Sequence, residues 1–426
     1  MTIGNIPVLE LDLPGGRRSY SDRGVAVTGI HGYVGKVLSW NSIERSVSEH
    51  DNALSRPEFV VVIDDNDKDF AHLIEGGSGH QVRRSAARFK LYGSGLVAWT
   101  EFSGKLDTWE QQSPHAYVLS LRQDDIPLEK KFPKYRLTQF DWPHADSTAI
   151  AQYAPIVFGV HDSNADTNEG MLPTYHIDTS GYRHLVSIGY VNVRRVYGDG
   201  TLISSGDYSI THPTVNGTDV TLVDFSADTY EDQVITVDCD GYDTDGDGGG
   251  TVIENPVTQL EYLLENFVYG DYRSGSWFTS AAPIADTEFT TAKDFADREG
   301  YEGAIYVAGD QIKGRDFVNA WLTSWDARAY WTRYGNIAPL FLDHAITDIY
   351  KSGDSWIRWE RHEAGFSQRN NVDGITSRIA VRYVKNSVDG QLKQTIEVRD
   401  LSIDEENTVR EIFEENNKAV VITGQF

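Results

Sequence analysis

Residues 185–200 read LVSIGYVNVRRVYGDG, and this stretch decides the fold class. It holds two short apolar runs, 185–190 and 191–197, and a Gly-Asp-Gly turn follows the second. Runs rich in β-branched and aromatic residues between turn residues are typical of strands. Similar short runs follow at 208–210, 220–225 and 234–237. Closely spaced strands of this kind predict a small barrel or sandwich.

Strand signals also dominate the chain before this stretch. They lie at 35–40, 58–63, 96–102 and 117–121. Their alternating apolar and polar residues predict half-buried antiparallel strands. Between 123 and 145 prolines stand among charged residues, which predicts a connector. A short helix is predicted at 146–153, ended by Pro155.

The period of the apolar residues changes at Asn255. This residue is a suitable helix cap, and Pro256 occupies the first helical position. Apolar residues then recur at helical spacing until Gly270. A second helix is predicted at 317–325 and a hairpin from the strands 328–332 and 337–341. This region is therefore predicted to be an α+β unit inserted among β segments.

Strands return after residue 355. They are predicted at 356–359, 375–383, 391–398 and 419–423, with a short acidic helix at 404–415. The predicted fold class is mainly β with α+β, in which β-barrel-type domains carry an inserted α+β unit. The predicted domains are an N-terminal β-barrel-like domain (1–135), a second β domain (136–254), an α+β domain (255–345) and a C-terminal β segment returning to the body (346–426).

The composition excludes several classes of protein. The 426 residues contain 38 Lys and Arg against 64 Asp and Glu, a formal net charge of -26, which repels polyphosphate and disfavours sequence-specific nucleic-acid binding. No run of roughly 18 apolar residues occurs, and the start MTIGNIPVLELDLPGG lacks the features of a signal peptide. We therefore expect no membrane insertion by this chain. The single cysteine, Cys239, excludes an internal disulfide and a cysteine metal site.

The sharpest local signal is an acidic loop. Its carboxylates Asp243, Asp245 and Asp247, a glycine turn, and Glu254 match the spacing of an EF-hand calcium loop. These four residues are the predicted calcium ligands, and calcium is the one cofactor the sequence suggests. The alternative is an exposed acidic loop. A strand at 234–237 precedes it where an EF-hand has a helix, and Gly250 replaces the usual apolar residue.

No motif predicts catalysis. The 12 histidines are scattered, and the sequence contains no HExxH, GxSxG, P-loop or GxGxxG after a strand. We therefore expect no catalytic residues and a protein that is not an enzyme. The aromatic content of 12% suits barrel cores and subunit interfaces. It also leaves open a β-rich carbohydrate-binding module or cell-wall glycosidase, in which rings stack on sugars and paired carboxylates act.

Four motifs occur in a characteristic order. They are APIVFG at 154–159, VRRVYGDG at 193–200, VITVD at 234–238 and NPVTQLEYLLENFVYG at 255–270. This order resembles the baseplate hub, or tail-tip, proteins of long-tailed, siphovirus-like phages and of gene transfer agents. The segment 317–335 is similar to the helix and hairpin of that family.

The resemblance implies a structural virion protein at the tail tip. Such hub domains alternate β-barrels with α+β units and form a homotrimer, a ring that closes or extends the tail tube and allows DNA passage at ejection. The implied partners are a distal tail protein, a tape-measure protein and tail fibre or spike proteins. Acidic residues facing the lumen would let DNA slide without sticking. The alternative within a virion is a distal tail ring protein, which would be hexameric.

Overall fold

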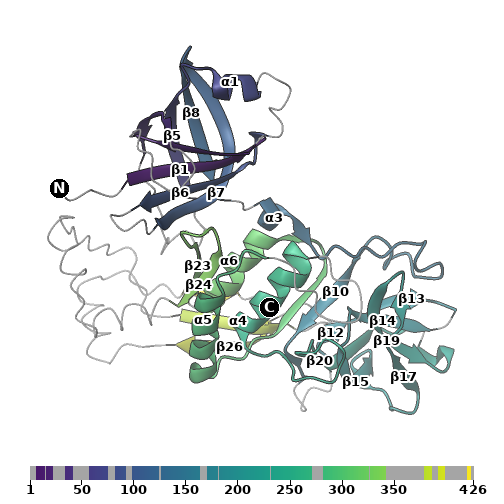
Figure 1. The fold of residues 1–426 in the computed structure, drawn as a ribbon. Helices are drawn as coiled ribbons and strands as arrows, with labels where there is room; N and C mark the ends of the chain where they lie inside the picture. Colours follow the sequence, from purple (N-terminus) through teal and green to yellow (C-terminus); the bar gives the residue numbers. More distant parts are fainter. Residues whose placement is uncertain are drawn as a thin grey trace, which may run out of the picture. The chain divides into compact units, whose positions relative to one another are not determined.

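The computed structural model describes residues 6–14, 16–22, 34–41, 57–74, 82–92, 98–123, 126–163, 170–180, 182–230, 232–270, 282–325, 327–341, 379–385, 392–398 and 420–423. It is mostly β with a few helices, which confirms the predicted fold class (Figure 1). Contacts define two compact units. Unit 1 contains the described residues of Met1–Lys131, Ser280–Phe295 and Lys313–Ala345, and unit 2 those of Phe132–Thr279, Ala296–Ile312 and Ile346–Phe426. The four-domain division stays a prediction.

Unit 1 contains a curled, half-barrel sheet. Its strands are β1 (Ile6–Leu13), β2 (Gly16–Ser21), β3 (Val34–Gly35), β4 (Val37–Trp40), β5 (Glu58–Asp64), β6 (Ala86–Tyr92), β7 (Ala98–Ser113) and β8 (Ala116–Arg122). Their order is β3-β2-β1-β6-β7-β8-β5-β4. Only Lys36 separates β3 from β4, so the segment 34–40 bonds to β2 in parallel and to β5 antiparallel. One stretch of chain thus occupies both ends of the sheet.

The inner face of this sheet is apolar. Leu9 and Leu11 of β1 and Val61 and Ile63 of β5 are fully buried at alternate positions, as a pleated strand with one covered face requires. The short helix α1 (Asp69–Leu73) follows β5. The buried carboxylate of Asp65 accepts hydrogen bonds from the first-turn amides of this helix, each 2.9 Å long. Asp65 therefore satisfies donors that a helix start leaves free.

The other elements of unit 1 include two predicted features. Helix α6 (Gly314–Ser324) buries Phe317, Trp321 and Leu322, and β23 (Ala327–Trp331) pairs with β24 (Ile337–Phe341), which confirms the predicted helix and hairpin. Helix α3 (Ile126–Glu129) and the short strands β9 (Lys131–Phe132) and β22 (Ile312–Lys313) complete the connections. Helix α5 (Asp286–Glu299) begins in the unit 1 segment and ends in the unit 2 segment of the chain. The sequence does not predict it, because its buried residues are mainly alanines, which give a weak apolar period.

Unit 2 contains two five-stranded sheets. The first is built from β11 (Val160–His161), β12 (Leu172–Pro173), β15 (Asn192–Gly198), β16 (Thr201–Leu202) and β20 (Ile235–Asp240). The second is built from β13 (Tyr175–Asp178), β14 (Arg183–Ile188), β17 (Tyr208–Thr211), β18 (Thr214–Val215) and β19 (Thr218–Phe225). These strands confirm the short strands predicted between 185 and 237.

Unit 2 contains further elements besides these two sheets. They are β10 (Tyr153–Phe158) paired with β21 (Ile305–Gly309), the 3-10 helix η2 (Asp228–Tyr230), helix α4 (Pro256–Leu263), the π-helix η3 (Leu264–Tyr269), and a sheet of β25 (Ile379–Lys385), β26 (Leu392–Val398) and β27 (Val420–Thr423). Asn255 caps α4 through its side chain, as predicted. The strands predicted at 375–383, 391–398 and 419–423 correspond to β25, β26 and β27. The strand at 356–359 and the helix at 404–415 lie outside the described residues.

The predicted helix at 146–153 was wrong. This segment forms successive turns, and β10 begins at Tyr153. Asp146 Oδ1 accepts hydrogen bonds from the backbone N and the hydroxyl of Thr148, both 2.7 Å long. Asp and Thr side chains that bond to nearby backbone groups compete with a helix in this way. Among the described residues, no helix is long and apolar enough to cross a membrane.

Candidate functional site

The four ordered motifs meet in unit 2. Gly241, just after β20, donates from its backbone N to Gly159 O at 2.7 Å, and Tyr242 N donates to Val157 O at 3.0 Å. β10, with the motif at 154–159, therefore runs beside the end of β20, which contains most of the motif at 234–238. On its other side β20 pairs with β15, where Val193 stands opposite Cys239. Three segments far apart in sequence are thus adjacent.

Aromatic rings add the helix to this centre. The Phe158 ring contacts Tyr242 edge-on at 4.8 Å between centroids, and Tyr242 stacks on Phe267 at 5.8 Å. Tyr242 OH also donates to Ile188 O. Phe267 lies in the π-helix, whose wider turns change the direction of side chains relative to an α-helix. The orientation of Phe267 toward Tyr242 therefore depends on the π-helical register.

Two glycines permit this close packing. A Cβ atom on Gly241 would stand 2.6 Å from Phe158 Cα. Gly159 has a φ of +77°, and a Cβ there would collide with Gly303 O. Both positions require glycine because backbone, and not a movable side chain, occupies the space.

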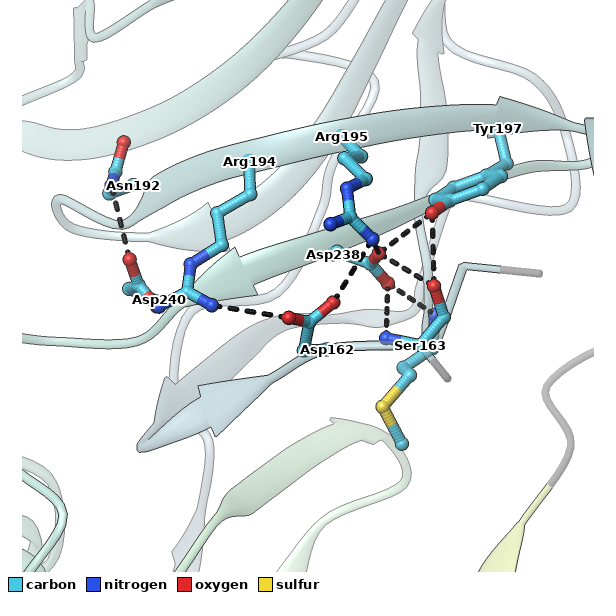
Figure 2. A network of polar contacts seen from close by, with 9 residues as sticks. Asp162, Ser163, Asn192, Arg194, Arg195, Tyr197, Asp238 and Asp240 are labelled. Atoms are coloured by element: carbon cyan, nitrogen blue, oxygen red, sulfur yellow. Dashed lines mark hydrogen bonds and ion pairs between the residues drawn. The ribbon is translucent and has the colours of Figure 1, made fainter. Parts of the chain in front are cut away.

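A buried carboxylate organises the first sheet of unit 2 (Figure 2). Asp238 is 0% exposed, and its carboxylate accepts hydrogen bonds from Ser163 N at 3.0 Å, Ser163 Oγ at 2.7 Å and Tyr197 OH at 2.9 Å. Met171 N donates to it at 3.3 Å. A carboxylate with this many donors is stably accommodated without water. Asp238 therefore fastens the segments beside β11 and β12 to β15 and β20.

Two arginines complete the network. A β-bulge between Val193 and Arg195 turns consecutive side chains toward one side. Figure 2 shows Arg194 and Arg195 around Asp162, each with a guanidinium nitrogen 3.3 Å from its carboxylate. Arg194 also pairs with Asp240 at 2.5 Å. The hydrogen-bond donors of the network pair with acceptors of the same network. Its role is therefore to hold the strands and the segment around Ser163 in place.

Sequence reasoning missed this network. The sequence predicts a strand at 234–237, but it assigns no role to Asp238, Ser163 or Tyr197. A local signal existed in Asp238 and Asp240, which are acids in an otherwise apolar strand, and in the adjacent arginines Arg194 and Arg195. Charged residues in a buried strand usually have partners.

Three of the four predicted calcium ligands, Asp243, Asp245 and Asp247, lie in a tight hairpin. Asp243 is 5% exposed, and its two oxygens accept from Gly246 N at 2.5 Å and Gly250 N at 2.8 Å. Asp245 and Asp247 are exposed on the turn, while Glu254 lies past it beside the cap of α4. No group of three or more His, Cys, Asp or Glu that could hold a metal occurs among the described residues, which include all four. Calcium binding stays a prediction.

Asp243→Ala is expected to lower the free energy of unfolding by about 1–3 kcal/mol, because one buried and one part-buried amide lose their acceptor. Asp245→Ala is the matched control and should change it by less than about 0.5 kcal/mol. Thermal denaturation with and without millimolar calcium measures both effects. Equal stability of the two variants would contradict the role of Asp243 as the acceptor for the hairpin amides. A rise in melting temperature with calcium that occurs in the wild type and is lost in both variants would support the calcium loop.

Comparisons with known proteins give a weak likeness to a chain of a virion particle. No protein-family model matches the sequence, and no curated protein matches it. The structure is similar to a chain from the "Virion of native gene transfer agent (GTA) particle", with a TM-score of 0.24 and 8% identity, over 55% of this chain and 80% of that one. A TM-score this low does not show a common fold.

Proposed function

We propose that this chain is a structural virion protein that forms the hub ring at a tail tip. In this role it closes or extends the tail tube, anchors the distal tail, tape-measure and fibre or spike proteins, and lets DNA pass at ejection. One observation carries the proposal. The motifs at 154–159, 193–200, 234–238 and 255–270, whose order resembles the hub family, pack against one another in one structural centre of unit 2.

Motifs that meet in space are easier to understand as parts of one fold than as chance matches. Each motif contributes to the contacts: Phe158 and Gly159 come from the first, Arg195 from the second, Asp238 from the third and Phe267 from the fourth. None of these contacts brings a nucleophile and a base together, so we propose no catalytic role.

Assembly into a ring needs surfaces that copies can share. The outermost strand of the first sheet of unit 2, β16, pairs with β15 over two residues, and its Leu202 is exposed. The outer edge of a sheet can offer backbone groups to a neighbouring copy, and an exposed apolar side chain adds contact area. The net charge of -26 favours a tube wall through which DNA slides without binding.

The test is the position of the chain in the particle. Particles carrying an epitope-tagged copy are labelled with gold-conjugated antibody and viewed by electron microscopy, with untagged particles as the control. We expect one cluster of label at the tail tip and a threefold assembly in averaged images. Label along the tube, on the capsid or nowhere in the particle would refute the proposal. A sixfold ring would indicate the distal tail protein, and binding to isolated cell-wall polysaccharide by a monomer would indicate the carbohydrate-binding alternative.

A further inference from the structure

Two stacked histidines join an outer strand to the second sheet of unit 2. His176 on β13 stands directly opposite His184 on β14. Their rings are parallel within 3°, with centroids 4.6 Å apart. His184 is 4% exposed, and the ring of Phe225 contacts it edge-on. His184 is therefore sealed from water, while His176 is half-buried.

The hydrogen bonds of the pair are consistent with a neutral His184 ring. The hydroxyl of Thr174 donates its proton to Ile235 O at 2.9 Å, so it accepts from Nδ1 of His184 at 3.1 Å. Nε2 of His176 is enclosed and has no hydrogen-bond partner. A proton added to His184 would place a cation against a parallel imidazole in a buried site that disfavours charge.

The described charged groups near the pair are three carboxylates and one arginine. Asp178 on β13 and Asp224 on β19 both pair with Arg183 of β14, at 3.9 Å and 3.1 Å. Asp146, from the turn segment, lies near His176, but its Oδ1 accepts two hydrogen bonds from Thr148. Among the described residues, no carboxylate offsets the effect of burial on His184, because burial and the neighbouring His176 both lower its pKa.

Strand β13 also holds the turn segment 138–152. Asp146 N donates to His176 O at 3.0 Å, and both the backbone N and the hydroxyl of Thr179 donate to His144 O at 2.9 Å and 3.1 Å. β13 is outermost in the order β13-β14-β19-β17, and its pairing with β14 is irregular after His176. A short outer strand of this kind can open without unfolding of the whole unit.

We propose that the His176–His184 pair is an acid-sensitive latch, which holds β13 and the segment 138–152 in place near neutral pH and releases both when it takes up a proton. This inference does not depend on the proposed hub function.

The direction of the pH effect follows from His184. Burial lowers the pKa of His184 from its ordinary 6.5 to about 3. The opened strand binds a proton below about pH 6.5, whereas the closed strand does so only near pH 3, so acid favours opening over this window. Stability from the latch is complete above pH 6.5 and declines as the pH falls. Between about pH 7.5 and pH 5.0 the population of the opened state should rise roughly 30-fold.

Hydrogen exchange of the full chain, read by mass spectrometry and corrected for the intrinsic pH dependence of exchange, tests the latch. At about pH 5.0 we expect protection roughly 30-fold weaker than at about pH 7.5 in peptides covering 138–152 and 172–180, and unchanged protection in peptides from β5 and β8. His184→Phe keeps a flat ring but cannot titrate, so the acid response should disappear. His115→Gln, at an exposed turn, is the control and should respond like the wild type.

Equal protection at both pH values in the wild type would overturn the latch, whether or not His184→Phe folds. An acid response that persists in His184→Phe would overturn it as well. So would a response spread evenly over all peptides, because that pattern indicates global acid unfolding.

Discussion

Asp238→Ala is expected to lower the free energy of unfolding of unit 2 by about 4 kcal/mol, because removing one partner of a buried charged network leaves the others unsatisfied. The backbone N and hydroxyl of Ser163 and the hydroxyl of Tyr197 would all lose their acceptor. Chemical denaturation of the purified chain, followed by tryptophan fluorescence and circular dichroism, measures this loss. It should appear as a lower denaturant midpoint for unit 2.

Two variants separate the buried network from ordinary surface charge. Tyr197→Phe removes one hydrogen bond to Asp238 and should cost about 1 kcal/mol. Asp162→Ala removes the exposed acid between the two arginines and should cost about 1 kcal/mol or less, as exposed ion pairs contribute little. If Asp162→Ala destabilised the chain as much as Asp238→Ala, the central role given to Asp238 would be wrong.

The second large effect is expected from Gly241→Ala. The added methyl group would stand 2.6 Å from Phe158 Cα and 2.7 Å from Val157 O, both backbone atoms. Since backbone cannot move aside as a side chain can, β10 and β20 must separate, at a cost of about 3 kcal/mol. Near-ultraviolet circular dichroism should show weakened signals from Phe158, Tyr242 and Phe267, whose ring contacts depend on this approach.

Gly206→Ala is the matched control for this change. A Cβ at Gly206 would be 3.8 Å from its nearest neighbour, Ser204 Oγ, which is ordinary contact. We expect a stability change of less than about 0.5 kcal/mol. Wild-type stability of Gly241→Ala would mean that the motifs do not pack closely, and the observation that carries the proposed function would be lost.

The helices and strands of this fold could be predicted where the local sequence pattern alone favours the element that forms. The strands between 185 and 237 are β-branched runs between turns, and Asn255-Pro256 starts α4 as its cap chemistry requires. The alternation of Leu9 and Leu11 with Glu10 and Asp12 carried a clear signal for β1 that was not used. Helix α5 gave little apolar period, and the turns at 146–151 depend on side-chain bonds that compete with a helix.

The site was harder to predict because its contacts join distant parts of the chain. Asp238 bonds to Ser163, 75 residues away, and no local pattern shows which acid will meet which donor. The spacing of Asp243, Asp245, Asp247 and Glu254 was visible, yet Asp243 bonds to amides of its own hairpin. Spacing indicates which residues are near in sequence, while the direction of each side chain depends on the backbone between them.

The segment 34–40 affects how unit 1 reaches its native state. Its two pairings, with β2 and β5, bring together strands that flank opposite ends of a sheet completed only by β8 at residues 116–122. A growing chain therefore cannot finish this sheet hairpin by hairpin. The long-range pairings are those of β1 with β6 and of β5 with β8. Pairing between strands far apart in sequence slows folding. We infer that the sheet of unit 1 forms late and cooperatively, because β1 and β5 can pair only after β6 and β8 have been made.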